Sequence, residues 1–165
     1  MKTKLLLMLA LVAWVLPGVH GADAGGVPRA VNVSTRARVG VGEDTMIVGF
    51  VITEAQAEVL LRAVGPSLEQ FDVTDFLPDP QLTIYDKAGH EIGTMGPNDT
   101  FGLAMVLFAK GYELTAGAFP IDVGFTKDAV WAGELPPGEY TMHVTSIGGH
   151  SGVALGEVYI VGKVN

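Results

Sequence analysis

The chain has 165 residues, of which 48% are hydrophobic, and its 18 acidic residues against 10 basic ones give a formal net charge of −8. A chain this acidic lacks the positive surface that attracts nucleic acids and anionic bilayers, so both are excluded as predicted partners. The length fits a single domain, and the absence of cysteine means that the fold must rest on its apolar core rather than on disulfides.

The first 24 residues are predicted to be a secretory signal peptide. A basic N-terminus is followed by an apolar run over 5–16, which is too short to cross a hydrocarbon core of about 30 Å as a helix. Small residues place the cleavage after Gly21 or Ala24, which makes 25–165 the mature domain. An N-terminal anchor that stays in place is the alternative. The sequence therefore predicts export to the periplasm, cell surface or medium, without stable membrane insertion after cleavage.

Three stretches at the start of the mature chain are typical of β-strands. Apolar and polar residues alternate over 30–34, and 45–53 is rich in β-branched and aromatic residues. Gly49 inside the second stretch suggests a bulge or the close approach of another backbone. The third stretch, 58–64, is apolar and is ended by Gly65-Pro66, a pair that we expect to be structural.

A hairpin and a helix are predicted next. The segments 82–85 and 91–94 flank the turn-forming sequence DKAGH, as the strands of a β-hairpin do. Apolar residues at helical spacing, behind a possible N-cap at Asp99 or Thr100, predict a helix of about ten residues near 100–110. We expect this helix to pack over one end of the sheets.

Three further strands are predicted at 128–134, 139–147 and 153–161, joined into a meander by the short turns LPPG and GGHSG. Strands and turn signals recur at the spacing that is typical of a sandwich or barrel. The predicted fold class is therefore all-β: an antiparallel β-sandwich, jelly-roll or immunoglobulin-like, with one short helix.

The GGHSG segment is the part of the sequence that comes nearest to a nucleophile motif. A nucleophile elbow needs a glycine two places on each side of the serine and a helix afterwards. Ser151 has Gly149 two places before it, but Gly152 follows it directly and a strand-like run comes next. Glycines around a polar pair between two strands are typical of a hairpin turn, in which Gly149 and Gly152 are structural.

The remaining histidines and acids have no spacing typical of a catalytic or metal site. His143 is predicted to lie on the surface of an alternating strand, and His90 and His150 in turns. Three aspartates interrupt the segment before the predicted hairpin: Asp72, Asp75 and Asp79. They match no calcium-binding loop and fit turn roles, so no cofactor is predicted, and calcium in an acidic loop is the alternative.

Arg62 is unusual because it lies inside the apolar sequence LLRAV. If this strand is central, the guanidinium must be paired or must reach the edge of the sheet. A salt bridge that tethers the strand is the favoured interpretation, and contact with an anionic ligand is the alternative.

Several phrases of the chain together resemble a recurring bacterial module. NVSTRARVGVGEDTMIVGFVI, LLRAVGPSL, LPDPQLTIYD, GAFP and KDAVWAGELPPGEYTMHVTSIGGHSGVALGEVY follow the order of that module, from about Val31 to Tyr159. The resemblance implies a β-rich module of secreted and cell-surface proteins of environmental bacteria, and it assigns no catalytic residue. LPPGEYTMHV is also similar to the strand-turn-strand of pre-peptidase C-terminal domains, which are small jelly-roll accessory modules.

Two classes of function are therefore considered. The first is a non-catalytic secreted or cell-surface module for adhesion, matrix or accessory binding, whose partner is a protein, a glycan or another copy of the chain. The second is a small secreted hydrolase whose site cannot be recognised in the sequence. The missing catalytic pattern and the acidic composition favour the first class.

Overall fold

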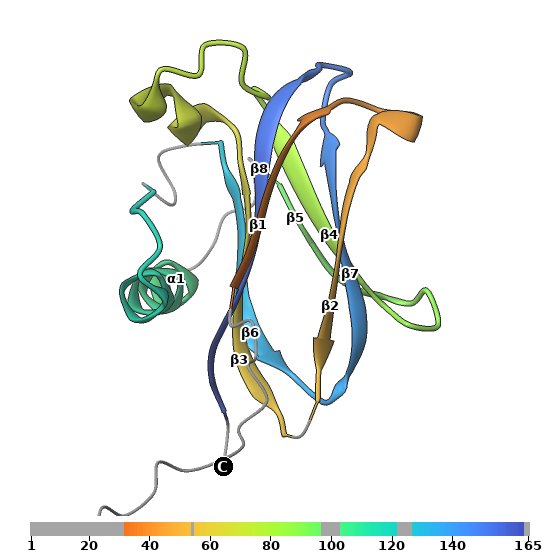
Figure 1. Cartoon of the computed structure of the whole chain (residues 1–165), viewed down its shortest axis with the longest axis vertical. Coiled ribbons are helices and arrows are strands. Elements are labelled where there is room, and N and C mark those ends of the chain that lie inside the picture. Colours follow the sequence, from red (N-terminus) through yellow and green to blue (C-terminus); the bar gives the residue numbers. More distant parts are fainter. Residues whose placement is uncertain (1–31, 54, 97–102, 122–126, 164–165) are drawn as a thin grey trace, which may run out of the picture.

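The computed structural model describes residues 32–53, 55–96, 103–121 and 127–163, in which two four-stranded sheets face each other (Figure 1). The predicted signal peptide, its cleavage sites and the predicted helix cap lie outside the described residues. Sheet A contains, in spatial order, β1 (Asn32–Val39), β8 (Gly152–Lys163), β3 (Ala57–Val64) and β6 (Ala129–Leu135). Sheet B contains β2 (Met46–Ile52), β7 (Gly138–Ser146), β4 (Pro80–Asp86) and β5 (Glu91–Met95).

The strand order is that of a jelly roll. The antiparallel pairs are β1 with β8, β2 with β7, β3 with β6 and β4 with β5. The chain therefore runs as one long hairpin, with its tip between β4 and β5, whose two arms wrap together around the core. This confirms the predicted all-β antiparallel sandwich and, of the two types considered, selects the jelly roll.

The prediction that the last three strands form a meander is wrong. β6 belongs to sheet A, β7 to sheet B and β8 to sheet A, so both connecting turns cross between the sheets. LPPG and GGHSG are therefore corners of the sandwich, and GGHSG is not a hairpin turn. Every strand of a sandwich directs one face to the shared core, so alternation is the same in either sheet and does not reveal which sheet comes next.

The main core lies between the two sheets, and the alternation of β2 follows from it. Every second residue of β2 points into this core and the residues between them are exposed; the core residues are Met46, Val48, Phe50 and Ile52. Gly49 is one of the exposed residues, in regular register with Thr141, and a Cβ added to it would meet no atom within 4 Å. The prediction of a bulge or a close backbone approach at Gly49 is therefore wrong, because this position faces outward from a regular strand.

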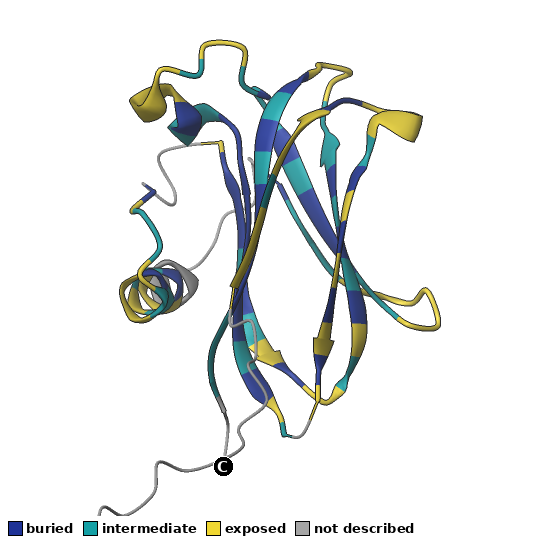
Figure 2. Cartoon of the chain, viewed as in Figure 1, coloured by how far each residue is buried: buried dark blue, intermediate teal, exposed yellow. Residues whose placement is uncertain are grey.

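A second core lies on the outer face of sheet A, beneath helix α1 (Leu103–Ala116) and the segment after it (Figure 1). Ala109 of the helix and Ile121 pack there with Leu60 and Tyr159 of the sheet. The helix has 14 residues, more than predicted, and it covers the face of sheet A instead of one end of the sandwich. β3 is consequently buried on both faces (Figure 2), which explains why its sequence is apolar apart from Glu58 and Arg62. No helix in the described ranges is long and apolar enough to span a membrane.

β1 extends beyond its predicted end at residue 34, because it remains paired with β8 as far as Val39. It is an edge strand, and most of its side chains are exposed. A strand with so few buried positions shows little apolar alternation, so its length could not be inferred from the pattern.

Candidate functional site

The outer face of sheet B is hollowed beside the turn between β4 and β5. One depression of about 700 Å³ lies over β2, β7 and β4, and another of about 660 Å³ continues it toward the turn between β6 and β7. The two depressions share part of their lining, so they form one elongated groove. We call it the sheet B groove and define it by six of its lining residues: Gly49, Tyr85, Lys87, Glu139, Thr141 and His143.

The strand register sets the floor of the groove. Gly49 of β2, Thr141 of β7 and Tyr85 of β4 lie side by side across the sheet. This row has no side chain at Gly49, a short hydroxyl-bearing one at Thr141 and an aromatic ring at Tyr85. The rings of Tyr85 and His143 are in contact, with centroids 4.8 Å apart and planes tilted by 59°. The floor is thus open at one side and bordered by aromatic rings at the other.

The charged groups at the rim of the groove are paired with their neighbours. Lys87 donates a hydrogen bond to Glu139 at 2.7 Å. The Asp86 carboxylate accepts backbone N–H bonds from Ala88 at 2.8 Å and from His90 at 2.9 Å, and it also lies 3.0 Å from the His90 ring. The backbone bond from His90 is the main cause of the lowered pKa of Asp86. These bonds fix the β4–β5 turn beside the groove.

His143 lies on the outer face of sheet B, the place that the alternation of its strand predicts, and its ring is half-buried. Burial disfavours the charged form, so the pKa of His143 is lowered from its ordinary value of 6.5. At pH 7 the ring is therefore neutral, and it can both donate and accept a hydrogen bond.

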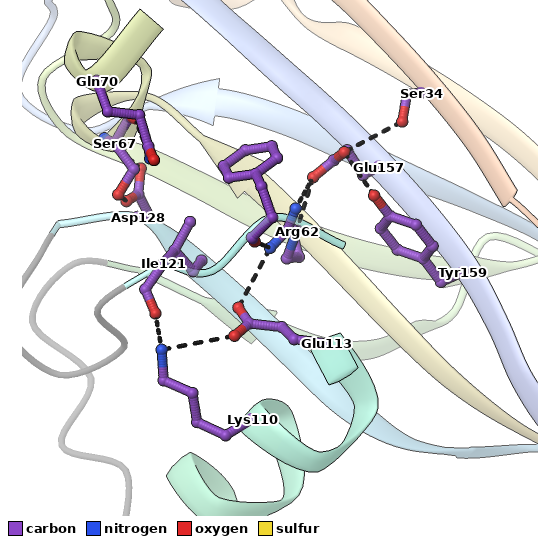
Figure 3. A network of polar contacts seen from close by, with 11 residues as sticks. Ser34, Arg62, Ser67, Gln70, Lys110, Glu113, Ile121, Asp128, Glu157 and Tyr159 are labelled. Carbon is purple, nitrogen blue, oxygen red and sulfur yellow. Dashed lines mark hydrogen bonds and ion pairs between the residues drawn. The ribbon is translucent and has the colours of Figure 1, made fainter. Parts of the chain in front are cut away.

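Arg62 forms the centre of a buried ion network beneath α1 (Figure 3). Its guanidinium has no exposed surface. It donates from Nε to Glu157 at 2.8 Å, and from Nη1 to Glu113 at 3.2 Å and to the Phe119 carbonyl at 2.6 Å. The group thus ties β3 to β8 and to α1, in the manner of the salt bridge that the sequence favoured, and presents no surface to an external anionic ligand.

The two carboxylates of this network have further partners. Glu157 accepts hydrogen bonds from the Ser34 hydroxyl at 3.1 Å and the Tyr159 hydroxyl at 2.7 Å. Burial raises the pKa of Tyr159, and its bond to Glu157 raises it further. Lys110 lies 3.5 Å from Glu113, so two cations face two carboxylates.

Gly65 lies between β3 and the short 3-10 helix η2 (Pro66–Phe71), and Pro66 is the first residue of that helix. A Cβ on Gly65 would lie 2.0 Å from the Leu77 carbonyl oxygen, so only glycine permits this approach. The Asp128 carboxylate accepts the backbone N–H of Gly65 at 2.7 Å and also bonds Ser67 (Figure 3). These contacts fix the point at which the chain leaves sheet A.

The GGHSG corner contains two glycines with positive φ, Gly148 at 78° and Gly149 at 77°. Gly152 is constrained differently, because a Cβ there would lie 2.4 Å from the Phe76 carbonyl oxygen. Ser151 is exposed and is not among the residues that line the sheet B groove. The corner therefore has the geometry of a structural turn, and the serine is not placed with the groove.

The three aspartates before the hairpin have different roles in the fold. Asp75 pairs with Arg38 at 3.3 Å, Asp79 pairs with Lys127, and Asp72 ends η2 with a positive φ of 61°. In the part of the chain that the structure describes, no three histidine, cysteine, aspartate or glutamate side chains gather where they could hold a metal ion.

Sequence reasoning missed the sheet B groove, although part of its signal was present. Alternation along β7 indicates that Glu139, Thr141 and His143 share one face. The strands beside β7 could not be recognised, because β2 and β4 come from distant parts of the chain. Only the fold brings Gly49 and Tyr85 next to Thr141.

Comparisons with known proteins give a likeness of fold only. No protein-family model matches the chain, and no curated protein matches it in sequence. Among solved structures, the chain is similar to the pre-peptidase C-terminal domain of a collagenase from Bacillus anthracis. The TM-score is 0.46 and the identity 8%, over 81% of this chain and 99% of that one. Membership in the bacterial module described above stays a prediction.

Proposed function

We propose that this chain is an exported, non-catalytic β-sandwich module for adhesion, matrix or accessory binding, and that the sheet B groove holds its partner. The observation that carries the proposal is the groove itself, which is elongated, partly aromatic and about 700 Å³ in its first part. Binding sites are typically concave and mostly apolar, with a few placed polar groups, and this groove fits that description.

The structural contacts of the two carboxylates at the groove support binding rather than acid–base catalysis by these groups. A general acid or base must exchange a proton with the substrate in the transition state. Glu139 and Asp86 instead hold Lys87 and the β4–β5 turn through hydrogen bonds. Their contacts fix the shape of the groove, which is what a binding surface requires.

Co-sedimentation with insoluble envelope and matrix material from the producing organism tests this proposal. Thr141→Trp fills the centre of the groove and should weaken binding by about tenfold or more. Thr145→Trp is the matched control, because it places the same ring on the same face of β7 but outside the groove lining, and it should bind like the wild type. If the two variants sediment alike, the groove is not the site.

Export is tested by the intact mass of the protein recovered from producing cells. The mature chain should begin between Ala22 and Gly26, the interval that contains or adjoins both predicted cleavage sites. A mass that retains 1–16 would refute the signal peptide and, with it, the proposed exported location.

A further inference from the structure

Gly49 stands apart from the other strand glycines of the described residues. The other strand glycines are Gly93, Gly133, Gly138, Gly152, Gly156 and Gly162. A Cβ added to any of these six would lie within 4 Å of another atom. Nothing lies within 4 Å at Gly49, its φ is not positive, and its pairing with Thr141 is regular. A glycine inside a strand costs stability, so its presence here needs a cause other than the fold.

The missing side chain at Gly49 keeps the centre of the sheet B groove open. Its neighbours on the outer face of β2, Ile47 and Val51, are 59% and 52% exposed and project from the sheet on either side. A side chain of that size at position 49 would lie beside Thr141 and narrow the groove on the side opposite Tyr85. The open position therefore leaves room for a ligand against the aromatic rings.

Recognition at the centre of this groove must come from side chains. β7 has β2 on one side and β4 on the other, so the backbone groups of β7 are already bonded within the sheet. A peptide lying over β7 could not add to the sheet as a further strand, because strand addition requires a free edge, and the nearest edge strand is β2. The side chains offer aromatic rings, the Thr141 hydroxyl and the Lys87–Glu139 pair.

We propose that the sheet B groove binds one chain of a neutral polysaccharide, with a sugar ring over Gly49 and against the rings of Tyr85 and His143. This inference rests on the proposed function of the groove as a binding site. A sugar ring has C–H groups that pack on an aromatic side chain and hydroxyls that need donors and acceptors. Both requirements are met here, and the elongated shape accommodates a polymer.

The charges around the groove select a neutral polymer. Asp86 and Glu139 supply two carboxylates against the single ammonium of Lys87, which Glu139 already engages. The whole chain carries a formal charge of −8. A uronate or sulfated polymer would bring further negative charge to this site, where like charges repel. Polymers of hexose or N-acetylhexosamine avoid this repulsion.

Affinity electrophoresis with laminarin, glucomannan and dextran as neutral polymers, and polygalacturonate as the acidic one, provides the direct test. Neutral polymer should retard the wild type, and Gly49→Val should reduce this affinity by about tenfold or more. The same substitution should raise the melting temperature, because valine favours strands more than glycine does. Phe71→Ala removes an aromatic ring that is 52% exposed outside the groove, and it should bind like the wild type. Retardation by the acidic polymer alone, or undiminished binding by Gly49→Val, would overturn the inference.

Sedimentation with envelope material tests polymers other than the four named above. It also separates the proposal that the groove is a binding site from the proposal that its ligand is a neutral polysaccharide. Anhydrous hydrogen fluoride cleaves glycosidic bonds and spares peptide bonds, so treating the envelope material with it beforehand should abolish the sedimentation that Thr141→Trp reduces. Protease treatment of the material beforehand, or salt added during binding, should leave the sedimentation intact. Sedimentation that survives this deglycosylation and is lost after the protease treatment would overturn the polysaccharide while the groove remained a binding site. Loss in added salt would likewise exclude a neutral polymer. Sedimentation that Thr141→Trp does not reduce would overturn both proposals.

Discussion

At the residue scale, Arg62 shows how this fold accommodates a buried charge. Removing such a charge from water is costly unless partners inside the protein compensate for it. Glu157 and Glu113 provide that compensation, and Lys110 balances the second carboxylate. Truncating Arg62 would leave both carboxylates buried without their main counter-charge, so the network depends on every member.

Arg62→Ala should therefore destabilise the folded chain by about 3 kcal/mol or more, the usual cost of breaking a buried ion pair. Arg38→Ala is the control, because the Arg38–Asp75 pair is exposed and such pairs contribute about 0–1 kcal/mol. Chemical denaturation of both variants measures the difference. A loss below about 0.5 kcal/mol for Arg62→Ala, the range of ordinary surface changes, would contradict the network.

The GGHSG corner should tolerate changes at its serine but not at its glycines. Gly149→Val places a Cβ at positive φ, at a cost of about 1–2 kcal/mol, and Gly152→Val drives one into the Phe76 carbonyl. Both variants should melt at lower temperature, while Ser151→Ala should stay within about 0.5 kcal/mol of the wild type. Labelling of Ser151 by a fluorophosphonate probe would revive the hydrolase alternative.

His143 should make stability depend on pH. Since burial lowers its folded-state pKa below 6.5, the unfolded chain binds more protons between the two pKa values. This contribution to stability is complete above pH 6.5 and declines as the pH falls through that interval. NMR titration of the ring should show a midpoint below 6.5, and His143→Phe should remove the matching part of the pH dependence of unfolding. A midpoint above 6.5 would have the wrong sign.

The sequence indicated which single residues have a structural role, but it did not indicate which residues they contact. An arginine in an apolar run predicts a buried, paired charge. The Arg62 side chain is fully buried and lies in ion pairs with Glu113 and Glu157. Its partners Glu113 and Glu157 lie 51 and 95 residues away, and no local pattern relates residues at those separations. The constraint on Gly152 likewise comes from a carbonyl that only the fold brings near.

At the scale of elements, helix α1 shows why a helix can be predicted more easily than its docking. Leu107, Phe108 and Leu114 are exposed, while Ala109 of the same helix is fully buried against sheet A. Apolar residues on both faces predict a helix but do not single out the face that docks. The buried Glu113 marks that face, and its meaning depends on Arg62 of another element.

Enlarging the docked face should have a much larger effect than changing the outer one. Ala109→Phe overfills the contact with sheet A and should cost about 1–3 kcal/mol. Leu114→Gln changes a residue that is 85% exposed, keeps similar helix propensity, and should stay within about 0.5 kcal/mol. Chemical denaturation of both variants measures the two losses, and equal losses would contradict docking through the face that carries Ala109.

At the scale of the whole molecule, two cores share one sheet. β3 directs Leu61 into the main core and Leu60 into the core beneath α1. The fold class could be predicted from local signals, namely alternation and the spacing of turns. The assignment of strands to sheets could not, because the inner face of a strand is equally apolar in either one.

The shared sheet should make the sandwich unfold as one unit. Leu60→Ala and Leu61→Ala each remove a fully buried side chain, from opposite faces of β3, and each should cost about 2–5 kcal/mol. Both variants should still melt in a single transition, with the fluorescence of Trp131 and far-UV circular dichroism coinciding. Val33→Ala, at a position 41% exposed, serves as the small-effect control. Separate transitions in either variant would show that the cores unfold independently.

The pairing of β1 with β8 has a mechanical consequence. Asn32 pairs with Tyr159, so the chain enters the sandwich close to where β8 runs out toward Lys163. Tension applied through these two points would peel β1 from β8 like a zipper, rupturing the ladder bonds one after another instead of loading them together. Little packing opposes this peeling, since most side chains of β1 are exposed. If both ends of the domain were attached to anchored neighbours, the domain would therefore unfold and extend at low force. If only one end were attached, no tension would act across the β1–β8 pair.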